Sequence, residues 1–85
     1  MDTEWDPAKN EQNKASHGLD FADFAGFDAE PFVVEDIRYD YGETRFNALG
    51  RIEGKPHAVT YTMRGDTMRL ISFRRAHEKE IARHE

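Results

Sequence analysis

Arginine is the residue type in this sequence with the clearest capacity for chemistry. A guanidinium group is planar and can hold two phosphate oxygens at once. Arg69 stands in an otherwise apolar run, where it needs an anionic partner. The pattern predicts a phosphate-binding surface, and the alternative is that these side chains are solvated or paired with Asp and Glu. The arginines concerned are Arg45, Arg51, Arg64, Arg69, Arg74 and Arg75.

His17 is the best single candidate for proton transfer. An imidazole titrates near neutral pH, and the C-terminus of a helix, where His17 is expected, favours a positive charge. Because this histidine stands alone, a helix cap is the competing interpretation. On the same predicted helix, Lys9, Asn13 and Lys14 are expected to be exposed and free to contact a ligand.

A metal site is only weakly suggested, at the end of the chain. His77, Glu80 and His84 are three and four residues apart, a spacing that could hold a divalent ion on one helix face. The stretch fails the His-Glu-x-x-His pattern, since position 81 is Ile. The chain also has no cysteine, which removes thiolate ligands and disulfides and fits a reducing compartment. We therefore expect no metal and no cofactor.

The length of the chain limits its organisation. With 85 residues it can bury one modest hydrophobic core, so we expect a single domain over residues 1–85. Hydrophobic residues make up 38% of the chain, which argues against disorder. The first residues lack the features of a signal peptide, and no apolar run approaches the ~20 residues that span a bilayer. These features predict a soluble, cytoplasmic protein without a membrane partner.

The net charge of -5 conceals a difference between the two halves of the chain. Residues 1–43 carry 12 acidic and 3 basic side chains, whereas residues 44–85 carry 5 acidic and 9 basic ones. Such a split permits binding of RNA phosphates on one face, while the opposite face meets water or a basic partner.

Short helices are predicted near both ends of the chain. An Asp-Pro pair introduces the first, over residues 7–16, and His17-Gly18 ends it. A second begins after Asp20, where Phe21, Phe24 and Ala25 repeat at helical spacing. Beyond Arg74, a stretch of Ala, Glu, Lys and Ile predicts a closing helix.

Strand-like runs fill the region between these helices. They cover residues 32–34, 37–41, 44–52, 57–63 and 67–73, and short connections that contain Gly separate the last three. These three strands should form an antiparallel meander. The predicted fold class is α+β, with two short N-terminal helices, an antiparallel sheet and a C-terminal helix.

Alternation along the strands predicts which side chains share a face of the sheet. The last strand divides into two sets, one of Met68, Leu70 and Ser72 and the other of Arg69, Ile71 and Phe73. On the strand over 44–52, the shared set is Arg45, Asn47, Leu49 and Arg51. Five or six guanidinium groups could thus converge on one surface.

Three blocks of residues carry a family resemblance by their order and spacing. The first is Trp5-Asp6-Pro7-Ala8-Lys9, followed by Asn13, His17-Gly18, Phe21 and Ala25. The second is Glu43-x-Arg45 with Gly50. The third joins Tyr61-Thr62-x-Arg64-Gly65 to Arg69-Leu70-Ile71-Ser72-x-Arg74-Arg75-Ala76. Together the blocks cover nearly the whole chain, and the sequence closely resembles the BrnT family of toxins.

The resemblance implies a fold, an activity and a partner. The fold would be similar to that of RelE-type ribonuclease toxins. The activity would be that of a ribosome-independent endoribonuclease of a type II toxin–antitoxin system, which cleaves RNA by metal-independent attack of the 2'-hydroxyl and inhibits translation and growth. The partner would be a cognate ribbon-helix-helix antitoxin that neutralises the toxin, in a hetero-oligomer that binds operator DNA through the antitoxin.

The residues that match the family pattern suggest two groups in the site. Arginines would hold the phosphate while His17 or Glu43 transfers protons, so the expected catalytic group is His17, Glu43, Arg64, Arg69 and Arg74. The expected RNA-binding group is Lys9, Arg45, Ser72 and Arg75 from the family pattern, together with Lys14, an exposed cation of the first predicted helix. Ser16 stands where the family usually has Lys, and the alternative function is a catalytically weak or inactive module that binds the antitoxin and acts in operon autorepression.

Overall fold

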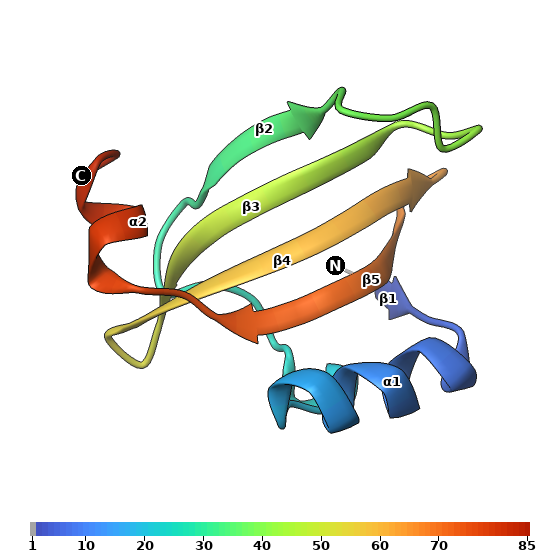
Figure 1. Ribbon diagram of the computed structural model, residues 1–85, viewed down its shortest axis with the longest axis horizontal. Helices are drawn as coiled ribbons and strands as arrows, with labels where there is room; N and C mark the ends of the chain where they lie inside the picture. Colours follow the sequence, from blue (N-terminus) through green and yellow to red (C-terminus); the bar gives the residue numbers. More distant parts are fainter. Residues whose placement is uncertain (1) are drawn as a thin grey trace.

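In the computed structural model of the chain, which describes residues 2–85, a five-stranded sheet has a helix near each end of the chain (Figure 1). The α+β class predicted from the sequence is confirmed. No helix within residues 2–85 is long and apolar enough to cross a membrane. The elements in chain order are β1 (Asp2–Glu4), α1 (Pro7–His17), the 3-10 helix η1 (Phe21–Asp23), β2 (Phe32–Asp36), β3 (Arg45–Ile52), β4 (Lys55–Arg64), β5 (Thr67–Arg75) and α2 (Glu78–Ala82).

The sheet is mixed, so the prediction of a purely antiparallel sheet was wrong. Its strand order is β1-β5-β4-β3-β2. The four strands from β2 to β5 pair antiparallel in sequence order, as predicted for the last three, but β1 pairs parallel with the start of β5. Three residues are too few to show an alternating pattern, which is why the sequence did not reveal β1.

The first helix forms as predicted, whereas the second is only a single turn. The Asp6 side chain caps α1 by accepting a hydrogen bond from the N–H of Ala8 at 2.9 Å, and Gly18 ends the helix with a φ of 72°. After η1 the backbone is already extended at Phe24. The prediction of two N-terminal helices was therefore wrong in the extent of the second, and the other α-helix is α2, near the C-terminus.

The predicted strand over residues 37–41 does not form. Asp36 accepts hydrogen bonds from the backbone N–H and the guanidinium of Arg38, and Asp40 accepts one from the N–H of Gly42 at 2.9 Å. Such local bonds from Asp side chains favour turns over a strand ladder. The apolar residues that suggested a strand, Ile37 and Tyr39, are exposed in this loop.

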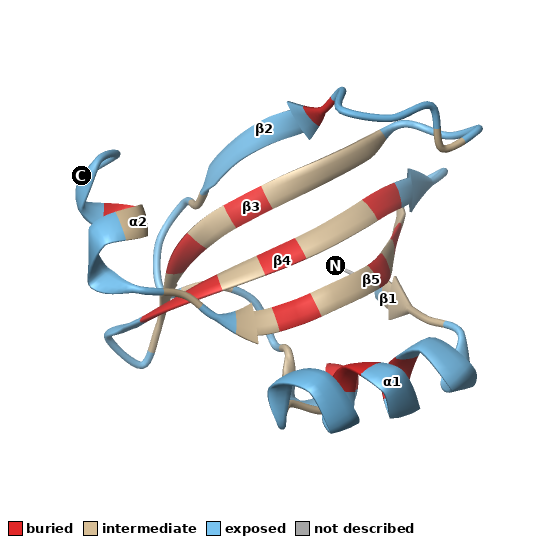
Figure 2. Cartoon of the chain, viewed as in Figure 1, coloured by how far each residue is buried: buried red, intermediate tan, exposed pale blue. Residues whose placement is uncertain are grey.

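The two faces of the sheet differ in what covers them. The segment from Trp5 to Phe27 covers one face, where Phe21, Val59 and Leu70 are almost completely buried (Figure 2). The core on this side also contains Met68 and Phe73. On the opposite face, which we call the open face, α2 covers only one end of the strands (Figure 1). The open face therefore offers a surface for a ligand.

Helix α1 docks through amide side chains rather than apolar ones. Asn10 and Asn13 are its two buried residues, so the expectation that Asn13 is exposed was wrong. The side chain of Asn13 donates to the carbonyls of Leu19 and Phe73 and accepts from the N–H of Phe73. Because an Asn side chain can match a backbone N–H and C=O pair, a polar helix can lie against the edge of β5.

Candidate functional site

A bulge in β5 brings Ser72 and Arg74 to the face of the sheet that Arg69 occupies. Leu70 pairs with Tyr61 and Ser72 pairs with Thr60, so Ile71 is an extra residue in the ladder. The predicted division of this strand was therefore wrong beyond residue 70. Phe73 joins Met68 and Leu70 in the core, whereas Arg69, Ser72 and Arg74 share the open face.

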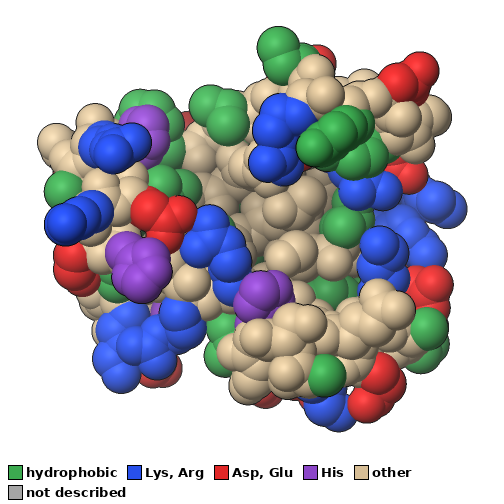
Figure 3. Space-filling view, viewed as in Figure 1, with side chains coloured by type: hydrophobic (Ala, Val, Ile, Leu, Met, Phe, Trp, Pro, Cys, Tyr) green, Lys and Arg blue, Asp and Glu red, His purple; other side chains and the backbone are tan. Residues whose placement is uncertain are grey.

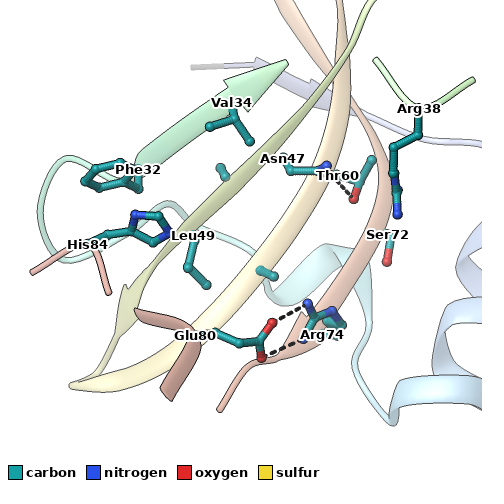
Figure 4. Close-up of a pocket in the computed structure, with 12 residues that line it drawn as sticks. Phe32, Val34, Arg38, Asn47, Leu49, Thr60, Ser72, Arg74, Glu80 and His84 are labelled. Carbon is teal, nitrogen blue, oxygen red and sulfur yellow. Dashed lines mark hydrogen bonds and ion pairs between the residues drawn. The ribbon is translucent and has the colours of Figure 1, made fainter. Parts of the chain in front are cut away.

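The main groove lies on the open face and has a volume of about 370 Å³. Asn47, Thr60 and Ser72 form its polar floor on three neighbouring strands, and the Thr60 hydroxyl donates to the side-chain Oδ1 of Asn47 at 2.7 Å (Figure 4). In a space-filling view the centre of this face is hollow, and Lys and Arg side chains gather around the hollow (Figure 3). The remaining walls come from Phe32, Val34, Arg38, Ala48, Leu49, Ala58, Arg74, Glu80 and His84.

One end of the main groove is formed by an ion pair between β5 and α2. Arg74 donates to the two carboxylate oxygens of Glu80 at 2.8 and 3.2 Å (Figure 4). These bonds, with a further one from the N–H of His77, lower the pKa of Glu80 to about 2. The same contact raises the pKa of Arg74. At neutral pH this end therefore holds an ionised carboxylate that is too weak a base to accept a proton.

Arg38 supplies a second cation at the rim of the main groove. Its guanidinium donates to both carboxylate oxygens of Asp36, at 2.9 and 2.8 Å, and its side chain points toward the groove (Figure 4). These hydrogen bonds hold the pKa of the Asp36 carboxyl far below its usual range. Since Asp36 is buried and Arg38 is exposed, the pair presents a fixed cation to solvent.

A smaller depression, which we call the side groove, runs between α1 and β5 and has a volume of about 140 Å³. Lys9 and His17 line it from α1, and Ile71 and Ser72 line it from the bulge. Ser72 also lines the main groove, so the two grooves meet at this residue. An imidazole, an ammonium group and the Arg74 guanidinium thus border one continuous polar surface.

A family model described as "Ribonuclease toxin, BrnT, of type II toxin-antitoxin system" matches residues 5–80. The chain belongs to this family. The resemblance seen in the sequence is thereby confirmed, and the chain is a ribonuclease toxin of a type II system with an antitoxin as partner. No curated protein matches the sequence.

The grooves of this BrnT-family chain contain four of the ten expected site residues. Ser72 and Arg74 line the main groove, and Lys9, His17 and Ser72 line the side groove. Arg69 shares the open face but is held by Glu4 of β1 at 3.0 Å. Arg64 ends β4, and its register opposite Thr67 puts it on the same face, where it is exposed.

The other expected residues lie away from the grooves. The guanidinium of Arg45 stacks over the Tyr41 ring at 4.1 Å, and its buried Nε has no hydrogen-bond partner within residues 2–85. Glu43 is exposed in the loop between β2 and β3. Lys14 pairs with Glu11 on the surface of α1. Arg75 pairs in register with His57 and so lies on the face opposite to Arg74. Arg51 is bound by Glu78 and Glu85. The expected convergence of five or six guanidinium groups on one surface was therefore wrong.

The histidines near the C-terminus do not form a ligand set. Within residues 2–85, no group of three His, Cys, Asp or Glu side chains is arranged to hold a metal ion. His77 precedes α2 as its N-cap, and His84 lies beyond its end and packs against the ring of Phe32. Glu80 faces Arg74. His77, Glu80 and His84 therefore do not lie on one face of a helix, although their spacing would allow it.

The sequence reasoning missed Arg38 and Thr60 as groove residues. Arg38 lies in a predicted strand that does not form, and its spacing of two from Asp36 is the signal for the side-chain turn that positions it. Thr60 alternates with Ala58 on β4, and its pairing with Asn47 follows from the predicted hairpin. The register of that hairpin, rather than either residue type, could have identified the polar floor.

Proposed function

We propose that this chain is a ribosome-independent endoribonuclease that cleaves RNA by attack of a 2'-hydroxyl on the adjacent phosphate, without a metal ion. The observation that carries the proposal is the junction at Ser72. There the side groove with Lys9 and His17 joins the main groove with Arg74. Cleavage of this kind needs a proton-transfer group beside cations that hold the phosphate, and this surface offers both.

The reaction can be written with the groups that border the two grooves. His17 removes the proton from the 2'-hydroxyl, and the 2'-oxygen forms a bond to phosphorus. The bond from phosphorus to the 5'-oxygen breaks, the 5'-oxygen takes a proton from water, and the protonated His17 returns its proton to the hydroxide that remains, which leaves a 2',3'-cyclic phosphate. Arg74 and Lys9 stabilise the added negative charge on the phosphate oxygens. Glu80 is excluded as the base because its pKa of about 2 keeps it ionised and weakly basic.

The remaining cations of the open face would hold the RNA backbone on either side of the cleaved bond. Arg64, Arg69 and Arg74 occur on the same face of β4 and β5. Phosphates contacted by such a row release counterions, so binding should weaken steeply with added salt. Arg69 can contribute only part of its donors while Glu4 holds one of them.

The antitoxin in this proposal is a ribbon-helix-helix protein that neutralises the toxin and carries the complex to operator DNA. In this proposal the cations of the open face are occupied by RNA, and the chain as a whole has a net charge of -5. DNA contacts would therefore come from the antitoxin, and the toxin would contribute RNA cleavage when it is released.

The decisive experiment is incubation of the purified chain with labelled RNA, with and without a chelator. We expect cleavage in both, with a cyclic phosphate at the new 3' end. An RNA with a single 2'-deoxyribose at the cleaved nucleotide should resist cleavage there, because the nucleophile is missing. Loss of cleavage in chelator, with recovery on adding a divalent ion, would contradict the metal-independent step.

Two neighbouring arginines provide a matched pair of variants. Arg74 borders the main groove and Arg75 lies on the opposite face. We expect Arg74→Ala to lower the cleavage rate by roughly 10²- to 10³-fold and Arg75→Ala to leave it nearly unchanged. Arg74→Lys should recover only part of the rate, because it keeps the charge and loses the planar fork. Equal losses in both Ala variants would contradict the assignment of the groove.

A second candidate function rests on the ion pairs of Arg69 and Arg74. Each of them is already engaged by a carboxylate, Glu4 or Glu80. A chain whose arginines stay paired would be a catalytically weak or inactive module that binds its antitoxin and supports operon autorepression. In that case the purified chain leaves RNA intact while the antitoxin still binds it, so the cleavage experiment separates the two functions.

A further inference from the structure

Exposed apolar side chains are concentrated on one edge of the sheet. Six large hydrophobic residues are exposed within residues 2–85, and five of them lie between Phe32 and Tyr39. They are Phe32, Val33, Val34, Ile37 and Tyr39. Figure 2 colours nearly all of β2 as exposed. Burial of such a patch is favourable, so a surface of this kind indicates a binding partner.

The edge at β2 is also open for backbone hydrogen bonds. All five residues of β2 pair with β3 on one side, and β2 is the last strand in the sheet (Figure 1). The opposite edge is protected, because β1 has only three residues and Asn13 binds the N–H and C=O of Phe73. An open, apolar edge strand invites a further strand unless it is blocked.

The charge around β2 selects the kind of strand that could bind. Residues 28–43 contain six acidic and one basic side chain. Glu30, Glu35 and Glu43 are exposed and form no ion pair within residues 2–85. A second copy of the chain would bring the same carboxylates against each other, which disfavours pairing. The edge therefore fits a strand with basic side chains.

We propose that the antitoxin binds as an extended segment, with alternating apolar and basic side chains, that adds a sixth strand to the free edge of β2. Backbone hydrogen bonds would supply affinity, and the side chains would supply specificity. Apolar side chains would cover Phe32 and Val34, which share the open face, and basic ones would pair with Glu35 on the opposite face. Membership of the family implies an antitoxin as partner, and the free edge of β2 is the proposed binding site for it.

The position of β2 links this binding to the candidate active site. Phe32 and Val34 line the main groove, so alternate side chains of an added strand would lie at its rim. Val33 pairs with Ala48, which lines an apolar pocket of about 330 Å³ on the other face of the sheet. An added strand at this rim would obstruct the entry of RNA into the main groove. This obstruction rests on the proposed function, whereas the binding of the strand to β2 does not.

Hydrogen exchange can test the added strand directly. The probe is the cognate antitoxin, mixed with the 85-residue chain. Every second N–H of β2 points away from β3, and we expect exchange of these amides to slow by at least about tenfold in the complex. A tight complex in which exchange over residues 32–36 is unchanged overturns the proposal. Slow exchange of β2 in the free chain, dependent on its concentration, also overturns it, since a second copy then occupies the edge.

Two charge variants test the complementarity. Glu35→Lys reverses a charge on β2, and Glu11→Lys makes the same change on α1, at the other side of the sheet (Figure 1). We expect the first to weaken antitoxin binding by roughly tenfold and the second by less than about twofold. Equal affinities of the two variants overturn the proposal. Binding is measured without RNA, so a chain that fails to cleave RNA but shows this difference contradicts only the proposed catalysis.

Discussion

Replacement of Asn13 should separate α1 from the sheet, because this one side chain makes three hydrogen bonds, two of them buried. Its amide donates to the carbonyl of Phe73 at 2.8 Å and to that of Leu19 at 2.9 Å, and its oxygen accepts from the N–H of Phe73 at 3.0 Å. Asn13 is only 5% exposed, so water cannot easily replace these bonds. The variant Asn13→Ala removes all three at once.

The size of the effect follows from the number of bonds lost. A buried hydrogen bond contributes about 0.5–1.5 kcal/mol net, and a backbone group left without a partner costs about 1–3 kcal/mol. Because some water can enter after the side chain is shortened, we expect Asn13→Ala to lower the free energy of unfolding by ~2–4 kcal/mol. For a domain of this size that corresponds to a fall in melting temperature of roughly 10–25 °C.

Two further variants make the reasoning specific. Asn13→Asp has the same shape but replaces the donor with an oxygen that faces two carbonyls, so it should destabilise at least as much as Asn13→Ala. Gln12→Ala alters the neighbouring exposed residue and should change the free energy by less than about 0.5 kcal/mol. Thermal and denaturant unfolding measure all three. A loss below about 1 kcal/mol for both Asn13 variants would refute the role of this side chain.

Three other changes test separate parts of the fold. Gly50→Ala would bring a Cβ to within 2.6 Å of the Phe27 ring, so it should cost ~1–3 kcal/mol, and an unchanged melting temperature would contradict this contact. The pKa of Glu80 is lowered from 4.5 to about 2, so its ionised form stabilises the fold above pH 4.5 and this stabilisation is lost as the pH falls toward 2. Glu80→Gln should therefore lose stability less steeply in that range, and equal slopes would count against the pair. Arg51 binds Glu78 of α2, so Arg51→Ala should speed hydrogen exchange in this helix, and unchanged exchange would show that other contacts hold it.

Local signals in the sequence predicted the bounds of helices and strands better than they predicted strand pairing and loop conformation. The cap and the final Gly fixed α1 to within one residue, and the Gly-containing turns located the last three strands. The wrong predictions concern segments whose structure depends on side-chain hydrogen bonds or on a neighbouring strand, and a local sequence pattern shows neither. Asp36 and Asp40 favour turns where Ile37 and Tyr39 suggested a strand. β1 exists only because β5 offers it an edge.

The sequence predicted several residues of the candidate site, but it did not predict which of them contact each other. Lys9, His17, Ser72 and Arg74 matched a family pattern, and all four line the two grooves. Glu80 was considered only as a metal ligand, although it pairs with Arg74. An ion pair between a strand and a distant helix depends on where the helix docks, and neither spacing nor composition contains that information.

The bulge in β5 shows what the sequence could have revealed. Apolar core positions on this strand are Met68, Leu70 and Phe73, a spacing of two and then three. The polar positions Arg69, Ser72 and Arg74 slip by one residue at the same place. Strict alternation would instead bury the Ser72 hydroxyl and expose the Phe73 ring, at a cost of about 1.5–3 kcal/mol for the ring alone. When the apolar and the polar positions of a strand shift by one residue at the same place, the sequence therefore indicates a β-bulge. In β5 this shift places Ser72 at the junction of the two grooves rather than in the core.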